Sequence, residues 1–348
     1  MTLEKSSVEV RSHARLHVCL IDMNGSMGRV DGGVGIALSD PTLLVSVRPA
    51  DSLEIDYILK PFVKRFFDEF GRFNVSIKAK SVFERHVGLG STTQLALSVC
   101  KALAELKGLS MDTYEMARVM GRGGTSGIGV SAFEGGGSLI VDGGHRFGAF
   151  GKKGFAPSDR VKASAARPLV KLSLPLDWRF VIAIPKKIKK VYGDLEVALF
   201  NRFSPIPERD VEALSRIILV KMLPSAVEAD LEGFGIAINM IQKIGFKKFE
   251  VMYQGETVRE LMQLGLKFGA AGAGMSSFGP AVYFLVAGDR EAQSLNQRIA
   301  DFSKETFIAR PYDKGAETRL CSEQGVQQRC KPIQTEAVTS RNSHKSQP

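Results

Sequence analysis

A glycine-rich segment directly before an amphipathic stretch constrains this chain more than any other feature. Residues 88–94 read Gly-Leu-Gly-Ser-Thr-Thr-Gln, and Leu95, Val99, Leu103 and Leu106 follow at helical spacing. Glycine lets backbone N–H groups approach an oxyanion, because no Cβ stands in the way. The first turn of a helix has N–H groups without intrahelical partners, and the helix dipole favours a phosphate there. The segment therefore predicts an anion-binding loop at the start of a helix.

Two established phosphate motifs do not match this segment. No Gly-Lys-Ser/Thr closes it, so it is not a Walker A loop, and a single Gly-x-Gly is not a Rossmann fingerprint. Capping of the helix by Ser91 or Thr92 explains the same residues without any ligand. Both interpretations stay open on this motif alone.

Length, charge and hydropathy narrow the class of protein. With 348 residues, 44% of them apolar, the chain can form two compact domains or one large one with a buried core. No apolar run approaches the roughly 20 residues that a membrane span needs. The polar residues 1–11 lack the apolar core of a secretory signal, so we expect a cytoplasmic protein without a membrane partner.

The formal net charge of +10 raises the question of nucleic-acid binding. The densest basic run, residues 186–190, follows an apolar strand, and the other basic residues are scattered among acids without interleaved aromatic residues. We therefore expect no nucleic-acid partner. A basic excess also suits an enzyme with polyanionic substrates, because positive potential raises their local concentration.

The first half of the chain predicts a β-rich layer with helices. Arg15 and His17 share one face of its first strand, where His17 is expected to be a hydrogen-bonded strand histidine rather than a catalytic group. The expected strands are 15–22, 34–38, 42–47, 74–79 and 138–142, and the expected helices are 57–70, 91–106 and 112–121.

The second half mixes strands and helices without regular alternation, which indicates an α+β domain. We expect strands at 180–184, 281–286 and 306–310, with helices at 206–222, 225–243, 256–267 and 290–303. The basic, irregular residues 143–176 are interpreted as a connection. The predicted domains are therefore 1–176 and 177–311.

Residues 312–348 are polar and poor in large apolar side chains, so we expect a disordered tail. Cys321 and Cys330 lie in this tail, whereas Cys19 and Cys100 fall inside apolar elements. None of the four has metal-ligand spacing.

Three glycine-bearing stretches occur in a fixed order: after the first strand, at 88–94, and at Gly272–Gly274. In that order they resemble the three motifs of the GHMP kinase superfamily, over roughly residues 15–310. The resemblance implies a β-rich N-terminal domain with helices, a ferredoxin-like C-terminal domain, and a phosphate-bearing ligand between them. A homodimer is compatible with such a fold.

One departure argues against a kinase. Many of these kinases carry a Pro-Ser-Gly-Ile-Asp-type stretch whose aspartate acts on the acceptor hydroxyl, whereas residues 125–129 here read Thr-Ser-Gly-Ile-Gly. Gly129 cannot accept a proton, so the base of that site is missing. A small-molecule kinase that uses another base, such as Asp142, remains the alternative.

Within the superfamily, residues 15–35, 88–94 and 121–129 resemble the β-ribofuranosylaminobenzene 5'-phosphate synthase family. The resemblance implies a reaction of methanopterin biosynthesis that needs Mg²⁺. Phosphoribosyl pyrophosphate is joined to 4-aminobenzoate or 4-hydroxybenzoate at the ring carbon bearing the carboxylate, with release of carbon dioxide and pyrophosphate. Which of the two acids is used stays open.

This chemistry suggests roles for particular residues. Breaking the bond from C1 to pyrophosphate puts positive charge on the ribose and negative charge on the leaving group. Arg29 offers a bidentate fork to a phosphate, and Asp22 is expected to bind Mg²⁺ or to stabilise the ribose cation. The alternatives without a ligand are that Asp22 caps its own turn and that Arg29 forms a surface ion pair. The other expected phosphate- and substrate-binding residues are Arg15, Asn24, Gly88, Gly90, Ser91, Thr92, Thr93, Gly274 and Ser276.

Overall fold

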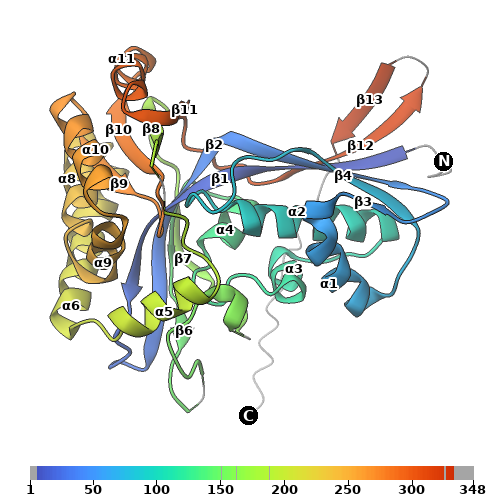
Figure 1. Cartoon of the computed structure of the whole chain (residues 1–348), viewed down its shortest axis with the longest axis horizontal. Helices are drawn as coiled ribbons and strands as arrows, with labels where there is room; N and C mark the ends of the chain where they lie inside the picture. Colours follow the sequence, from blue (N-terminus) through green and yellow to red (C-terminus); the bar gives the residue numbers. More distant parts are fainter. Residues whose placement is uncertain (1–5, 150, 162, 188, 325–326, 333–348) are drawn as a thin grey trace, which may run out of the picture.

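The computed structural model describes residues 6–149, 151–161, 163–187, 189–324 and 327–332. These residues form two sheets, one large and one of four strands, with helices packed on both (Figure 1). The expected α+β class is confirmed. The domain boundaries at residues 176 and 311 stay predictions.

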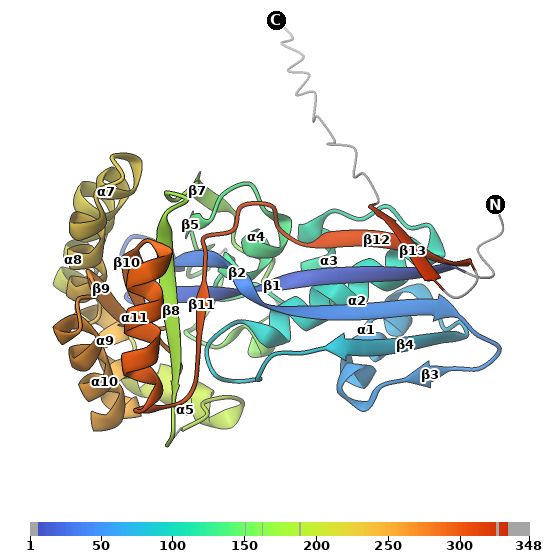
Figure 2. The ribbon, with the colours of Figure 1, turned by 90° about the horizontal axis from the view of Figure 1, so that it is seen from above.

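Two long strands, β1 (Ser6–Asp22) and β2 (Arg29–Pro49), form the antiparallel hairpin on which the molecule is built. Figure 2 shows them running side by side along much of the structure. β2 replaces the two separate strands expected at 34–38 and 42–47, because pairing with β1 continues on both sides of residues 38–41. The other strands of this sheet are β3 (Glu54–Ile55), β4 (Val75–Ser81), β5 (Leu139–Asp142), β6 (His145–Arg146), β7 (Pro168–Leu172), β12 (Glu317–Gln324) and β13 (Gln327–Pro332).

Helix α2 (Ser91–Lys107) packs on β1 and β2 and forms the centre of the N-terminal core. Its Leu95, Val99 and Leu103 are fully buried, as the helical spacing predicted. Asp112 caps α3 (Thr113–Met120) with a capping box that includes Glu115. The remaining helical segments of this half are η2 (Tyr57–Leu59), α1 (Lys60–Phe70), α4 (Ile128–Glu134) and η3 (Ser158–Arg160).

The second sheet has the antiparallel order β11 (Ser303–Ala309), β8 (Trp178–Pro185), β10 (Val282–Ala287) and β9 (Gly272–Met275). Its helices stack together at one end of the molecule (Figure 1). They are α6 (Glu208–Ile217), the π-helical turn η4 (Ile218–Met222), α7 (Leu223–Val227), α8 (Leu231–Ile241), α9 (Gly245–Gln254), α10 (Glu256–Lys267) and α11 (Asp289–Ala300), with α5 (Asp194–Phe203) leading into them.

The sequence did not predict α4, α5 or α9, and it merged α7 and α8 into one helix at 225–243. The break at residues 228–230 has a local cause. Asp230 adopts an extended conformation and accepts a hydrogen bond from the Gly233 N–H, so it starts a new helix as its N-cap.

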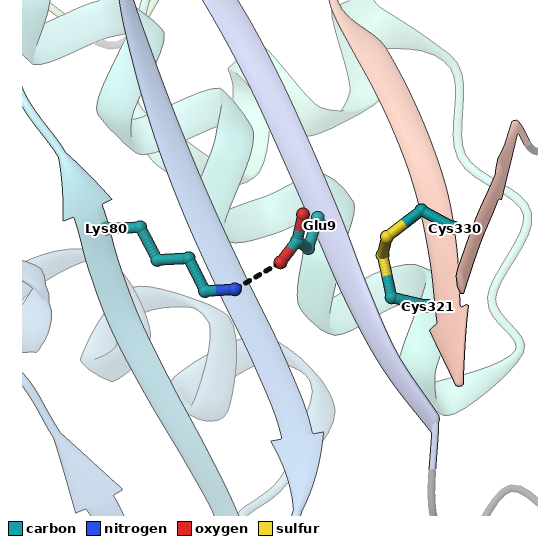
Figure 3. The surroundings of a disulfide bond; sticks show 4 residues. All are labelled: Glu9, Lys80, Cys321 and Cys330. Atoms are coloured by element: carbon teal, nitrogen blue, oxygen red, sulfur yellow. Dashed lines mark hydrogen bonds and ion pairs between the residues drawn. A yellow bond between two sulfur atoms is a disulfide. The ribbon is translucent and has the colours of Figure 1, made fainter. Parts of the chain in front are cut away.

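The expectation of a disordered tail from residue 312 is wrong for residues 317–324 and 327–332. β12 pairs with β1, and β13 pairs with β12, with Cys321 opposite Cys330. These two cysteines form a disulfide across the hairpin, and nearby Lys80 forms an ion pair with Glu9 of β1 (Figure 3). Backbone pairing with a long edge strand orders a segment that is too polar to form a core. Residues 333–348 lie outside the described part.

Among the described residues, no helix combines the length and apolar character needed to cross a bilayer.

Candidate functional site

A cavity of about 470 Å³ opens where β1, the start of α2 and the C-terminal half meet. The N-terminal half contributes Arg15 and His17 from β1 and the loop before α2. The C-terminal half contributes Glu196, Glu250 and Ser277. Both halves of the chain therefore build one site, at the segment that the sequence singled out.

The 88–94 segment forms the predicted loop before a helix. Gly88 and Gly90 both have left-handed φ values, +97° and +83°. A Cβ at Gly88 would lie 2.2 Å from the Ser276 carbonyl oxygen, so only glycine fits there. Ser91 and Thr92 do not cap α2, whose N-cap is Gly90 and has no side-chain cap hydrogen bond. The first N–H groups of the helix are therefore not occupied by a cap and lie beside the cavity.

Ser276 holds this loop against β1. Its hydroxyl donates to the Gly88 carbonyl at 2.7 Å and accepts from the His17 N–H at 2.9 Å. Ser276 is fully buried and does not line the cavity, and Gly274 does not line it either. From the sequence, we expected Ser276 and Gly274 to contact the ligand. The structure gives Ser276 a supporting role instead, and Ser277 and Gly279 are the lining residues of that late loop.

Within the described part of the chain, four arginines line the cavity: Arg15, Arg65, Arg85 and Arg122. Arg15 donates to the Gly88 carbonyl at 2.6 Å, and its Nε is buried without a partner among the described residues. Burial and the nearby Arg122 lower the pKa of Arg15 to about 10, against the opposing effect of Glu250, so it stays cationic at neutral pH. The guanidinium groups raise the positive potential of this part of the cavity.

Thr93 and Arg122 both line the cavity, and their side chains are hydrogen-bonded to each other. The Arg122 guanidinium donates to the Thr93 hydroxyl through Nε at 3.2 Å and Nη2 at 3.0 Å. Arg122 and Arg85 are functional candidates that the sequence did not single out, although both stand beside glycine segments that it did. Their position next to those segments was the available signal.

His17 differs from the expected hydrogen-bonded strand histidine. It shares the cavity face with Arg15, as period two predicted, and is 4% exposed. Neither of its ring nitrogens has a hydrogen-bond partner among the described residues. Burial, Arg15 and Lys247 hold its pKa well below 6.5, so the imidazole is neutral.

Glu250 of α9 brings a carboxylate to the cavity. It forms a buried ion pair with Lys247, whose ammonium also donates to the Met275 and Ser277 carbonyls at 3.2 Å each. Burial raises the pKa of Glu250, while Lys247 and Arg15 oppose the shift. The sequence gave no signal for Glu250, because the helix that carries it was not predicted.

Gly129 lines the cavity, in the first turn of α4. A Cβ at this position would lie 3.1 Å from the Thr93 methyl carbon, so a larger side chain would be crowded here. The alternative base, Asp142, is 1% exposed and does not line the cavity. Its carboxylate accepts from the Gly127 and Gly144 N–H groups, each at 2.9 Å. Asp142 therefore supports the backbone and does not reach a substrate.

Asp22, Asn24 and Arg29 do not line this cavity. Asp22 accepts from the N–H groups of Asn24 and Gly25, at 2.8 and 2.9 Å, as in the alternative that it stabilises its own turn. The Asn24 amide donates to the Ile206 carbonyl at 2.7 Å. Arg29 lines a second, open hollow, where it donates to the Gly143 and Gly144 carbonyls. The structure thus separates these three residues from the 88–94 loop.

The two halves of the chain match two different family models. Residues 56–137 match the GHMP kinases N terminal domain, and residues 222–304 match the GHMP kinases C terminal domain. Beta-ribofuranosylphenol 5'-phosphate synthase of Archaeoglobus fulgidus is 40% identical over 90% of this chain and 100% of its own length. The chain belongs to the beta-ribofuranosylphenol 5'-phosphate synthase family.

The enzyme of the same name from Methanothermobacter thermautotrophicus is also 40% identical, over 79% of this chain and 87% of its own. Membership in the beta-ribofuranosylphenol 5'-phosphate synthase family makes this chain an enzyme, a pentosyltransferase that acts on small molecules, as the motifs predicted.

Solved structures of low identity share the fold. Phosphomevalonate kinase of Streptococcus pneumoniae has a TM-score of 0.64 at 15% identity, covering 87% of this chain and 99% of its own. Homoserine kinase of Cytophaga hutchinsonii has a TM-score of 0.63 at 15% identity, covering 90% and 97%. This chain therefore has the GHMP kinase fold.

Proposed function

We propose that this enzyme condenses phosphoribosyl pyrophosphate with 4-hydroxybenzoate, releasing carbon dioxide and pyrophosphate and giving a ribofuranosylphenol 5'-phosphate for methanopterin biosynthesis. The names of the relatives specify a phenol product, which favours 4-hydroxybenzoate over 4-aminobenzoate. The observation that carries the proposal is a cavity with four arginines at a helix N-terminus and glycine at the position of the kinase base.

The 88–94 loop and the arginines suit the phosphates of the donor. The first N–H groups of α2 and the Arg15 guanidinium face the same cavity, and together they offer backbone and charged donors to one anion. When the pyrophosphate leaves, negative charge grows on its oxygens. Donors already in place stabilise that charge without rearranging, which lowers the barrier.

Glu250 suits the positive charge that develops on the ribose. Its carboxylate is buried beside Arg15 and Lys247, at the side of the cavity formed by the C-terminal half. A carboxylate in a water-poor site stabilises positive charge on the ribose more strongly than it would in water. We therefore assign Glu250 to the ribose and the basic groups to the leaving pyrophosphate.

Mg²⁺ binds one or two carboxylates together with substrate phosphates in sites of this kind. Glu196 is a described carboxylate that lines the cavity besides Glu250, and it would hold the ion. The Oδ1 of Asp22 is already used by two amide groups outside the cavity, which does not suit the metal role expected from the sequence. When bound, Mg²⁺ neutralises charge on the pyrophosphate.

The test is release of labelled carbon dioxide from carboxyl-labelled 4-hydroxybenzoate by the purified enzyme. We expect release that requires both phosphoribosyl pyrophosphate and Mg²⁺ and that ATP does not support. Phosphorylation of a hydroxyl substrate by ATP, with no carbon dioxide released, would replace the proposal with a kinase.

A further inference from the structure

His17 occupies a fixed position on the cavity wall. Its N–H donates to the Ser276 hydroxyl at 2.9 Å, and its carbonyl accepts from the Ser277 N–H at 3.0 Å. The pairing of β1 with β2 is irregular between His17 and Cys19, and such irregularities re-aim side chains. The backbone therefore holds the imidazole in place without help from the ring itself.

Both ring nitrogens of His17 are buried without a partner among the described residues. A buried polar group without a hydrogen bond destabilises the folded protein. The ring packs closely against Gly33 of the neighbouring strand, since a Cβ there would lie 3.3 Å from Nε2. A side chain held rigidly and left without partners in a substrate cavity is a candidate for direct contact with substrate.

The neutral state of His17 indicates which substrate it contacts. A phosphate is better matched by the cationic arginines and by the α2 N-terminus. A neutral imidazole has one N–H donor and one bare acceptor nitrogen, which match a phenolic hydroxyl that both donates and accepts. The 4-hydroxyl of the aromatic acid is therefore the better partner.

We propose that His17 is the general base that removes the proton of the 4-hydroxyl group as the aromatic ring attacks the ribose. This inference rests on the proposed function and adds a catalytic residue to it.

The proposed condensation conserves atoms and electrons. The O–H bond of the 4-hydroxyl breaks, its proton goes to His17, and its electron pair moves through the ring to the para carbon, which bears the carboxylate. That carbon forms the new bond to C1 of the ribose while the bond from C1 to pyrophosphate breaks. The bond to the carboxylate then breaks, carbon dioxide leaves, and its electron pair restores the aromatic ring. His17 returns its proton to the 4-oxygen.

The surroundings make His17 a weak base, and a weak base suffices. Burial and the charges of Arg15 and Lys247 lower its pKa. However, the 4-hydroxyl becomes far more acidic than a phenol once the ring carries positive charge, so the proton transfer becomes favourable during the attack. 4-Aminobenzoate differs here, because its nitrogen can carry the positive charge without losing a proton.

The test compares His17→Gln and His17→Ala with the wild-type enzyme on both acids. Glutamine keeps hydrogen bonding but is no base. We expect kcat with 4-hydroxybenzoate to fall about 10²-fold or more in both variants, with the donor KM unchanged and a much smaller loss with any 4-aminobenzoate turnover. Added imidazole is expected to restore turnover of 4-hydroxybenzoate by His17→Ala.

His13→Gln is the matched control. His13 is another buried histidine of β1, but its Nδ1 bonds the Ser39 carbonyl at 2.8 Å, and it does not line the cavity. We expect this variant to keep wild-type kcat. Wild-type kcat in His17→Gln, equal losses with both acids, or no rescue by imidazole would overturn the role of His17. If the wild-type enzyme releases no carbon dioxide, the proposed function itself fails instead.

Discussion

At the scale of single residues, Arg15 and Arg29 both donate to backbone carbonyls, but they line different hollows. Arg15 lines the cavity beside the 88–94 loop, whereas the Arg29 side chain donates to two backbone carbonyls in the second hollow. A guanidinium with an unused donor near free helix N–H groups can bind phosphate at small cost, because little has to rearrange.

We expect Arg15→Ala to raise the KM for phosphoribosyl pyrophosphate about 10-fold or more, since a hydrogen bond to a charged group contributes about 1.5–3 kcal/mol. Steady-state kinetics checks this, with Arg48→Ala on the exposed part of β2 as control. The direct phosphate contact first suggested for Arg29 is tested in the same series. A donor KM raised by Arg29→Ala and unchanged by Arg15→Ala would place the donor elsewhere.

The contribution of Asp142 to the stability of the folded state is expected to depend on pH. Burial raises its pKa from 3.8 to about 6, against the opposing hydrogen bonds from Gly144 and Gly127. The folded state then binds this proton more tightly than the unfolded state. Its contribution to stability is full below the unfolded pKa and is lost as pH rises through the folded one.

Asp142→Asn removes that titration and leaves one of the two amide groups without its acceptor. We expect the variant to be less stable than the wild-type protein, with a deficit that shrinks as pH rises from 3.8 to about 6. Denaturant titrations at several pH values measure it. A deficit that stays constant or grows over this range would show that Asp142 is ionised throughout.

At the scale of elements, the 88–94 loop depends on contacts from the other end of the chain. Ser276 bonds both Gly88 and His17, so the loop, β1 and the segment after β9 form one unit. The sequence predicted the loop and its helix because glycine and helical spacing are local signals. It could not predict that the Ser276 hydroxyl bonds the Gly88 carbonyl of this loop, because the two residues are 188 positions apart.

Gly88→Ala tests this unit. The new Cβ would lie 2.2 Å from the Ser276 carbonyl oxygen and would also require a left-handed backbone. Gly71→Ala is the matched control, with a similar φ of +80° and no atom within 4 Å of the new Cβ. We expect Gly88→Ala to lower the melting temperature clearly more than Gly71→Ala and to weaken donor binding. Equal effects would mean that backbone strain alone decides both.

At the scale of the whole molecule, local signals predicted the fold better than the site. The α+β class, α2 and the segments near β8, β10 and β11 follow from periodicity and glycine placement. Glu250 could not be found, because the buried face of α9 carries the polar side chains of Lys247, Glu250 and Gln254, which interrupt the apolar pattern of a helix. The ordered hairpin β12–β13 was missed because its strands are held by pairing with β1. A homodimer and the absence of a nucleic-acid partner stay predictions.

This hairpin gives a whole-molecule prediction. The disulfide between Cys321 and Cys330 has a sequence separation of 9, and closing so short a loop contributes at most about 3 kcal/mol. None of the β12 and β13 side chains that the structure describes lines the cavity. We expect Cys330→Ser to lower the melting temperature while kcat stays at the wild-type value. A loss of kcat in the folded variant would contradict this separation of hairpin and cavity.

The central claim is that one cavity, at the start of α2, holds the phosphoribosyl donor. The most direct measurement is a crystal structure of the enzyme with phosphoribosyl pyrophosphate and Mg²⁺. We predict phosphate oxygens within hydrogen-bond distance of the first N–H groups of α2 and of the Arg15 guanidinium. A donor bound in the second hollow, beside Arg29 and away from the 88–94 loop, would contradict the assignment.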